Sequence, residues 1–416
     1  MNKIKKNMKD IIEAFKTKIL AWTPKTQYAS LIHIIIINEI FALRIFESKK
    51  QLRYSWSIIY AGTCIILYIV FLNIIININY KRWFAYNEIS YKLASYINIV
   101  CVMVFIVLGM LNTERSRKII ARCEQIDNTL ESFGIEKNYQ KTFFCVTQTL
   151  ITSSIIMISI ISLDYYSTIQ YQDNLNIFIF IAIITMSLGI LTFTILISIL
   201  QDKLHKINKI IKEIYQLSNT KDINIRYNMQ SLILCKFVII MDYNNRKYFV
   251  QHFLQITRYI HFEVLKLLRE LNQAYTYQIV LDLIMQFSSL LSVLYNGYFY
   301  LISLKLSEVL SNKGLIGFFV WIFLFFIKII FLNNHCTKFY NEIKITTHLL
   351  QELDICYLDN SIRNEIQQFL LQLLLHPFKF TAGGYILSNK LSAKFFGTLI
   401  TYLIIFIQIS TSINMK

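Results

Sequence analysis

Seven stretches of the chain are apolar and long enough to cross a lipid bilayer. A hydrocarbon core of about 30 Å requires about 20 helical residues, and a spanning segment must satisfy its own backbone hydrogen bonds, which favours helices. The seven stretches are residues 55–79, 93–111, 143–163, 177–200, 277–303, 315–335 and 395–412. This pattern predicts an all-α, polytopic membrane protein with seven transmembrane helices.

An eighth apolar patch, residues 31–43, is too short to span. It contains His33 and Glu39, and Arg44 follows it directly. A short helix with both apolar and charged positions is typical of a segment that lies in the membrane interface. We therefore expect an amphipathic helix at the cytosolic surface rather than a further span.

Apolar residues also recur every three or four positions outside the predicted spans, after the fourth span and before the fifth and seventh. This period is that of an amphipathic helix, and such helices must bury their apolar stripes against one another when they lie outside lipid. The stripes include Ile207, Ile211 and Ile214, then Ile256, Ile260 and Leu267, and finally Ile366, Phe369 and Leu373. We expect a cytosolic helical bundle continuous with the spans, and a loop over the polar stretch 219–230.

Composition supports a membrane protein and excludes several other classes. Hydrophobic residues make up 55% of the 416 residues, and the mean hydropathy is +0.47. The chain has only 10 glycines and 2 prolines, too few turn residues for a many-stranded barrel. The seven cysteines show no C-x-x-C spacing and the seven histidines no paired spacing, so we predict no metal site and no cofactor.

The distribution of positive charge predicts the orientation of the helices. Segments 1–54, 112–142, 201–276 and 336–394 hold 35 of the 42 Lys and Arg residues, and the lysine-rich side of a membrane protein faces the cytosol. We therefore expect a cytosolic amino terminus and an extracellular carboxy terminus. The formal net charge of +17 is then explained by cytosolic loops lying against anionic membrane lipid, and no nucleic-acid partner is predicted.

Few ionisable residues fall within the predicted spans. They are Asp164 at the outer end of the third span, Asp282 in the fifth and Lys328 in the sixth. We expect Lys328 to extend its ammonium group to the cytosolic surface, and Asp282 with Gln286 to form hydrogen bonds between helices. No set of catalytic residues is visible, so we predict that the protein is not an enzyme.

The seventh span has a polar face. Thr401, Gln408 and Ser412 follow one another at i, i+7 and i+11 and therefore share one side of the helix. Such a stripe either binds neighbouring helices together or lines an aqueous path. A single helix cannot enclose a pore, so the second interpretation requires several copies around an axis.

The outer halves of the spans are rich in aromatic residues, with a few polar side chains at similar depth. This pattern fits either an aromatic belt at the membrane interface or the wall of a pocket for a small organic ligand. The candidate ligand-binding residues are Tyr96, Asp164, Tyr166, Tyr295, Asn296, Tyr298 and Trp321.

The carboxy-terminal stretch resembles the signature of insect gustatory receptors, T-Y-h-h-h-h-h-Q-F, where h is hydrophobic. Here residues 401–409 read T-Y-L-I-I-F-I-Q-I, with Ile409 at the usual phenylalanine. Upstream, Phe369 and Gln372 resemble the family's F-x-x-Q, and residues 380–385, F-T-A-G-G-Y, resemble F-T-A-C-G-F with Gly383 at the cysteine.

This resemblance implies a ligand-gated, non-selective cation channel that detects small organic tastants. It implies a homo- or hetero-tetramer with related receptor subunits, in the plasma membrane of the dendrites of chemosensory neurons. Four copies of the last span would line the pore, with gate residues Thr401, Tyr402, Ile405, Gln408, Ile409 and Ser412. A hydrophobic constriction stops ions by dewetting, a property that Ile409 keeps. Leu403 stands where the sugar-sensing branch tends to carry an acid, which argues against a sweet receptor.

Three regions follow from these expectations. Residues 1–54 form a cytosolic segment with the interfacial helix, residues 55–335 hold spans one to six with the ligand-binding bundle, and residues 336–416 hold a cytosolic anchor helix and the pore-lining span. An insect odorant receptor of the same fold remains the nearest alternative. A G-protein-coupled receptor is less compatible, because that family places its amino terminus outside and the chain has no D-R-Y or N-P-x-x-Y motif.

Overall fold

Within the part of the chain that the structure describes, seven helices are long and apolar enough to cross a membrane. The computed structural model describes residues 23–48, 51–77, 88–132, 134–168, 176–219, 243–303, 313–356 and 359–414. The seven helices are α4 (Tyr54–Asn77), α5 (Glu88–Ser132), α6 (Tyr139–Thr168), α7 (Asn176–Asn219), α10 (Tyr243–Ser303), α11 (Lys313–Cys356) and α13 (Asn389–Asn414). Each overlaps one predicted span, which confirms the all-α, seven-span fold class. Residues 78–79 of the first predicted span, and the predicted loop from residue 220 to residue 230, lie outside the described residues.

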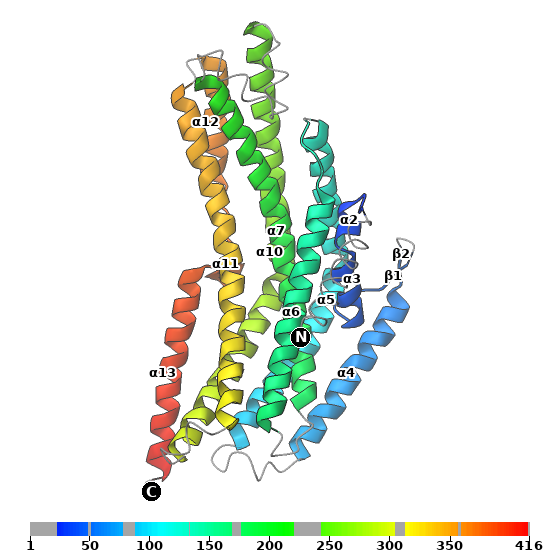
Figure 1. Ribbon diagram of the computed structural model, residues 1–416, viewed down its shortest axis with the longest axis vertical. Coiled ribbons are helices and arrows are strands. Elements are labelled where there is room, and N and C mark those ends of the chain that lie inside the picture. Colours follow the sequence, from blue (N-terminus) through cyan, green and yellow to red (C-terminus); the bar gives the residue numbers. More distant parts are fainter. Residues whose placement is uncertain are drawn as a thin grey trace, which may run out of the picture.

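Four of these helices extend well beyond the length of a span. The longest, α10, has 61 residues, which corresponds to roughly 90 Å. In Figure 1 the molecule is an elongated bundle in which α7, α10 and α11 run on to one end, beside α12 (Asn360–Leu375), whereas α13 ends at the opposite end. These extensions confirm the helices predicted from periodicity outside the spans.

The extensions share an apolar core. Ile207 and Ile211 of α7 are fully buried together with Leu267 and Leu271 of α10, at the spacing that puts each pair on one helical face. The same core continues without a break into the apolar segments of these helices. The predicted bundle is therefore continuous with the spans.

The amino-terminal segment packs into the side of the bundle. It consists of α2 (Gln27–Ser30), which Thr26 caps, and α3 (Ile32–Ile40), followed by a hairpin of β1 (Glu47–Ser48) and β2 (Gln51–Leu52). With nine residues α3 is too short to cross a membrane, as expected. Its Ile34 and Ile35 are buried in the same core as α6 and α7. The apolar face of α3, which was expected to lie in the membrane interface, is therefore largely covered by other helices of the protein.

A turn after α3 directs the following residues back into the bundle. Leu43 N donates to Asn38 O at 2.8 Å, and Ala42 has a φ of 56°, the left-handed conformation common at helix ends. Arg44 then lies 3.4 Å from the Glu47 carboxylate, which also accepts a 2.7 Å hydrogen bond from the Tyr28 hydroxyl. Burial and the carboxylate partner raise the pKa of Tyr28 above its usual value.

Gly109 provides the close approach between α5 and this turn. A Cβ on Gly109 would lie 2.6 Å from the backbone oxygen of Leu43, so one of the two backbones would have to move. We expect Gly109→Ala to lower the stability by about 1–3 kcal/mol, the usual cost of overpacking. Thermal unfolding of the detergent-purified protein measures this loss.

Gly62 is the matched control, because a Cβ there meets no atom within 4 Å. Gly62→Ala should leave the stability unchanged or raise it by up to about 1 kcal/mol, since alanine favours the helix. Equal melting temperatures for the two variants would show that α5 and the turn do not pack this closely.

Candidate functional site

The helix with the polar face, α13, lies at the edge of the protomer (Figure 1). It packs mainly against α10 and α11. Phe395 contacts Phe287 of α10 with ring centroids 5.6 Å apart, and Phe396 stacks on Phe326 of α11 at 4.1 Å. Only 11% of its apolar stretch is buried, compared with 72% for α7. Most of the surface of α13 is therefore open to lipid or to another subunit.

The predicted gate residues lie on this open surface. Thr401 and Gln408 are exposed, as are Tyr402, Ile405 and Ile409, which expose 48%, 41% and 50% of their surface. Thr401 Oγ1 donates to Gly397 O of its own helix at 3.0 Å. Ser412 belongs to α13, but its side chain lies outside the described residues.

In the described part of the polar stripe of α13, Thr401 and Gln408 do not bond this helix to its neighbours. Among the described residues, neither Thr401 nor Gln408 forms a side-chain hydrogen bond to α10 or α11. Aromatic side chains make those helix contacts instead, including Tyr402, whose ring lies 5.9 Å from that of Phe287. For these two residues, the first interpretation of the stripe, a polar contact between helices, does not hold within one protomer.

A small hairpin fixes the point where α13 leaves the bundle. It is formed by β3 (Thr381–Ala382) and β4 (Tyr385–Ile386), joined by Gly383 and Gly384 with φ of 56° and 84°. Both turn residues are left-handed, a conformation that glycine adopts most readily. Asn272 of α10 binds Thr381 twice, through a 3.1 Å bond from the backbone N–H and a 3.2 Å bond to the hydroxyl.

Phe380 anchors this hairpin in the core. Its side chain is fully buried, with ring centroids 5.4 Å from Phe339 and 5.8 Å from Phe193. The Tyr340 hydroxyl accepts a 2.8 Å bond from Phe380 N and donates to Leu387 O at 3.0 Å. Residues 380–385, which resemble the gustatory-receptor pattern, therefore form the structural junction between α12 and α13.

The structure brings two of the predicted ligand-binding residues into direct contact. Trp321 Nε1 donates to Asp164 Oδ1 at 2.8 Å, and the indole stacks on Phe180 at 4.8 Å. Asp164 is 5% exposed, so the indole partner partly satisfies a buried carboxyl group. This contact joins α6 to α11 at the outer end predicted from sequence.

The other predicted ligand-binding residues are spread over the part of the bundle that the sequence predicts to be the outer one. Tyr295 is buried, with its ring 6.4 Å from Phe406 of α13, and Asn296 Nδ2 donates to a serine one turn earlier at 3.3 Å. Tyr298 is half-buried, whereas Tyr96 and Tyr166 are 40% and 48% exposed. The structure does not gather this set into one described cavity.

A cavity of about 640 Å³ lies elsewhere, between α6, α7 and α11. Lys141, Lys206 and Lys209 line it together with three carboxylates, and Lys206 Nζ lies 3.2 Å from Asp202. The three lysines balance the charge of the three carboxylates. The cavity lies at the predicted cytosolic ends of the spans, so it is separate from the predicted outer ligand pocket.

Lys328 does not extend to the cytosolic surface, and that prediction is wrong. Its Nζ lies 2.5 Å from Asp282 Oδ1 of α10, and the two side chains are 10% and 0% exposed. Gln286 Nε2 donates to the other oxygen of the same carboxylate. A buried charge is far less costly when it is paired, which explains why Lys328 turns to Asp282 rather than to water. Asp282 and Gln286 were expected to form hydrogen bonds between helices. Asp282 does so, because it pairs with Lys328 of α11, whereas Gln286 binds Asp282 within α10.

A polar stripe along the inner face of α10 was missed by the sequence analysis. Its members are all less than 10% exposed and are spaced three or four residues apart: Tyr275, Gln278, Asp282, Gln286, Ser289, Ser292 and Asn296. Several bind α5, as when Ser289 Oγ donates to Asn98 Oδ1 at 3.0 Å. The spacing was visible in the sequence, but only the fold shows that this face is turned inward.

Comparison with known proteins identifies the family. The model of the seven-transmembrane chemosensory receptors matches residues 37–413. Two solved structures of the insect olfactory receptor OR5 from Machilis hrabei are similar in fold, and one of them is in complex with eugenol. They have TM-scores of 0.55 and 0.54 and sequence identities of 14% and 12%, and the matches cover 91% of this chain and 97% of OR5. No curated protein sequence gives a significant match. Since the family model covers nearly the whole chain, this protein belongs to the seven-transmembrane chemosensory receptor family.

Proposed function

We propose that this receptor is a gustatory receptor, a ligand-gated and non-selective cation channel that detects small organic tastants. It works in the plasma membrane of the dendrites of chemosensory neurons. Membership of the chemosensory receptor family supports a receptor, and the T-Y…Q ending of α13 supports the gustatory branch. The observation that carries the channel proposal is the exposure of the polar face of α13 at the edge of the protomer.

Four copies of α13 around one axis would form the pore. Thr401 and Gln408 then line the conduit, and Ile405 and Ile409 form a hydrophobic constriction that stops ions by dewetting. A small rotation of α13 that replaces Ile409 by the Gln408 amide at the narrowest point would open it. A ligand drives this change only if it binds the open state more tightly than the closed state.

The subunits would assemble through α12 and its surroundings, as a tetramer of identical or related chains. Leu371, Leu374 and Leu375 of α12 are 52%, 76% and 63% exposed, although this helix lies outside the seven candidate spans. An apolar surface of this kind outside lipid is typical of a protein interface. The burial of Phe369 on the other face of α12, against His261 of α10, leaves these leucines for a partner.

The ligand would bind within each subunit, in the outer half of the bundle near the Asp164–Trp321 pair. An aromatic wall with few polar groups fits a small organic molecule. The similarity in fold to the olfactory receptor OR5 favours an odorant receptor as the second candidate function. Because one of those OR5 structures holds eugenol, eugenol and other small phenols are suitable first probes here. Expression in gustatory rather than olfactory neurons would separate the two candidates.

Whole-cell recording from cells that express the chain tests the proposal. We expect a cation current that appears on addition of an active tastant and reverses near 0 mV, because the channel does not select among cations. Recordings with the chain alone and with related subunits decide between homomeric and heteromeric assembly. A receptor that reaches the cell surface and signals without a current of its own would contradict the channel proposal.

Tags at the two ends of the chain test the predicted orientation. On intact cells, an antibody should bind a tag placed after Lys416 but not one placed before Met1, because the lysine-rich segments hold the amino terminus in the cytosol. Permeabilised cells, in which both tags should be labelled, are the control. The opposite labelling of intact cells would favour a G-protein-coupled receptor.

A further inference from the structure

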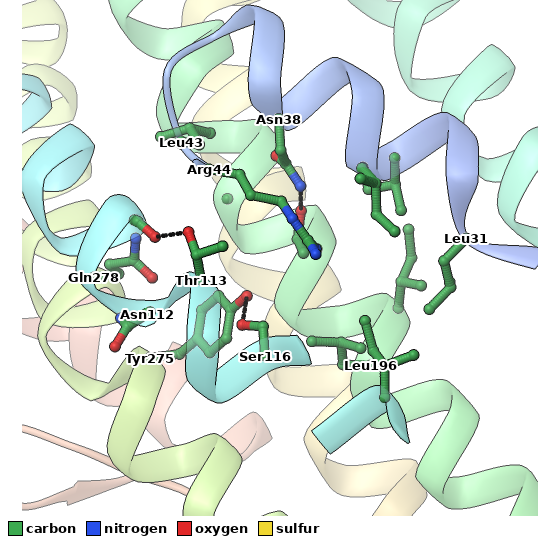
Figure 2. A pocket seen from close by; sticks show the side chains of 17 residues that line it. Leu31, Asn38, Leu43, Arg44, Asn112, Thr113, Ser116, Leu196, Tyr275 and Gln278 are labelled. Carbon is green, nitrogen blue, oxygen red and sulfur yellow. Dashed lines mark hydrogen bonds between the residues drawn. The ribbon is translucent and has the colours of Figure 1, made fainter. Parts of the chain in front are cut away.

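A small cavity lies where the amino-terminal segment meets α5, α7 and α10. Its volume is about 40 Å³. Figure 2 shows the side chains of Asn38 and Arg44 reaching into this space from the amino-terminal segment, opposite Tyr275 and Ser116. All four residues are less than 10% exposed. The cavity is therefore a polar space inside the bundle.

Three polar atoms around this cavity are buried without a hydrogen-bond partner among the described residues. They are Asn38 Oδ1, Gln278 Oε1 and Arg44 Nε. Buried polar atoms in proteins are almost always paired, with protein or with ordered water. Three unpaired atoms around one cavity indicate that a polar molecule occupies it.

The orientation of the two amides follows from their other bonds. Asn38 Nδ2 donates at 2.8 Å to Thr192 Oγ1, whose own hydrogen is donated to Leu188 O at 2.8 Å. Gln278 Nε2 lies 3.4 Å from the carbonyl oxygen of Phe105. A carbonyl oxygen accepts hydrogen bonds and cannot donate them. Both amide nitrogens are thereby fixed, and both amide oxygens are left as acceptors.

The occupant must both donate and accept hydrogen bonds, because the cavity offers two acceptors and the N–H of Arg44. A cation would meet the Arg44 guanidinium, and an anion would meet two amide oxygens. Arg44 and Arg117 lie 3.4 Å and 3.8 Å from Glu47. A second carboxylate, that of Glu39, accepts the backbone N–H of Glu47. Two guanidinium groups and two carboxylates therefore leave no net charge to attract an ion. A cavity of this volume has room for about three water molecules.

We propose that this cavity is a hydration site, in which an ordered cluster of water molecules bonds Asn38, Arg44 and Gln278. Two of these residues belong to the amino-terminal segment and the third to α10, so the cluster joins that segment to the bundle through water. Thr192 extends the connection to α7 through its bond to Asn38. This proposal concerns the fold of the protomer and does not rest on the proposed function.

Radiolytic labelling of the full chain in lipid nanodiscs, in H₂¹⁸O, tests the proposal. Hydroxyl radicals form from water next to a side chain, so the hydrated Tyr275 should be oxidised severalfold faster than its burial alone would allow. Tyr68 of α4 is the matched control, because it is similarly buried, at 8% against 6%, and does not line the cavity. Equal labelling of the two tyrosines would overturn the proposal.

A variant tests the assignment of the partners. Gln278→Met removes one acceptor at nearly constant length, and labelling of Tyr275 should then fall toward that of Tyr68. Gln148→Met, at an exposed position of α6, should leave it unchanged. Should Gln278→Met fail to fold, a cryo-EM map of the wild-type receptor that resolves bound water gives the answer. Water density within hydrogen-bonding distance of Asn38 Oδ1 and Gln278 Oε1 supports the cluster, and an empty or collapsed cavity overturns it.

Discussion

Lys328→Met is expected to destabilise the receptor by about 3–5 kcal/mol, the usual cost of removing one partner from a buried ion pair. The variant leaves the Asp282 carboxylate fully buried between helices, with only the Gln286 amide as a partner. Asp282→Asn should cost a similar amount, because it leaves the ammonium group of Lys328 unpaired. Melting of the detergent-solubilised protein, followed by size-exclusion chromatography, measures both losses.

The double variant Asp282→Asn with Lys328→Met is the control. It removes both charges and keeps a side chain that can bind Gln286, so most of the stability should return, because a neutral pair of similar volume often replaces a buried ion pair without loss. If each single variant melted at the wild-type temperature, the two charges would have to be in contact with water. That result would contradict the buried pairing of α10 with α11.

Gln408→Ala is expected to reduce the ligand-evoked current by about three- to tenfold, the equivalent of one hydrogen bond of roughly 1 kcal/mol at the narrowest point. In the proposed pore the amide replaces part of the water around a passing cation. The methyl group of alanine cannot do so, and Ile405 and Ile409 would then dominate the constriction. Whole-cell currents, normalised to surface expression, measure the effect, and reversal potentials in mixed cations show any change of selectivity.

Ser410→Ala is the matched control for this prediction. Two residues after Gln408, Ser410 points about 200° away around the helix, so it should face the protomer or lipid rather than the conduit. Its replacement should leave the current unchanged. Unchanged conduction in Gln408→Ala as well would remove this face of α13 from the pore.

The candidate site could be predicted only in part from the sequence. The polar face of α13 was readable, because three residues at i, i+7 and i+11 of a single helix share one side whatever surrounds the helix. The pairing of Asp164 with Trp321 was not, because these residues are 157 positions apart and meet only when α6 packs beside α11. The partner of Lys328 could not be predicted either, because it depends on the rotation of α11 against α10 and not on the length of the lysine side chain.

The sequence by itself determined the number and the approximate positions of the membrane helices, the helical extensions of the spans and the family. These follow from local properties: the length of an apolar run set against bilayer thickness, the period of an apolar stripe, and short motifs. Only the tertiary structure decided that the stripe of α10 faces α5, that the amino-terminal helix is buried in the side of the bundle, and that α13 stands at the edge. Those outcomes depend on how each helix is rotated and tilted against its neighbours. In lipid, close packing and a few polar contacts between helices determine these rotations and tilts. Such contacts join residues that are far apart in the sequence, so no single stretch of sequence predicts them.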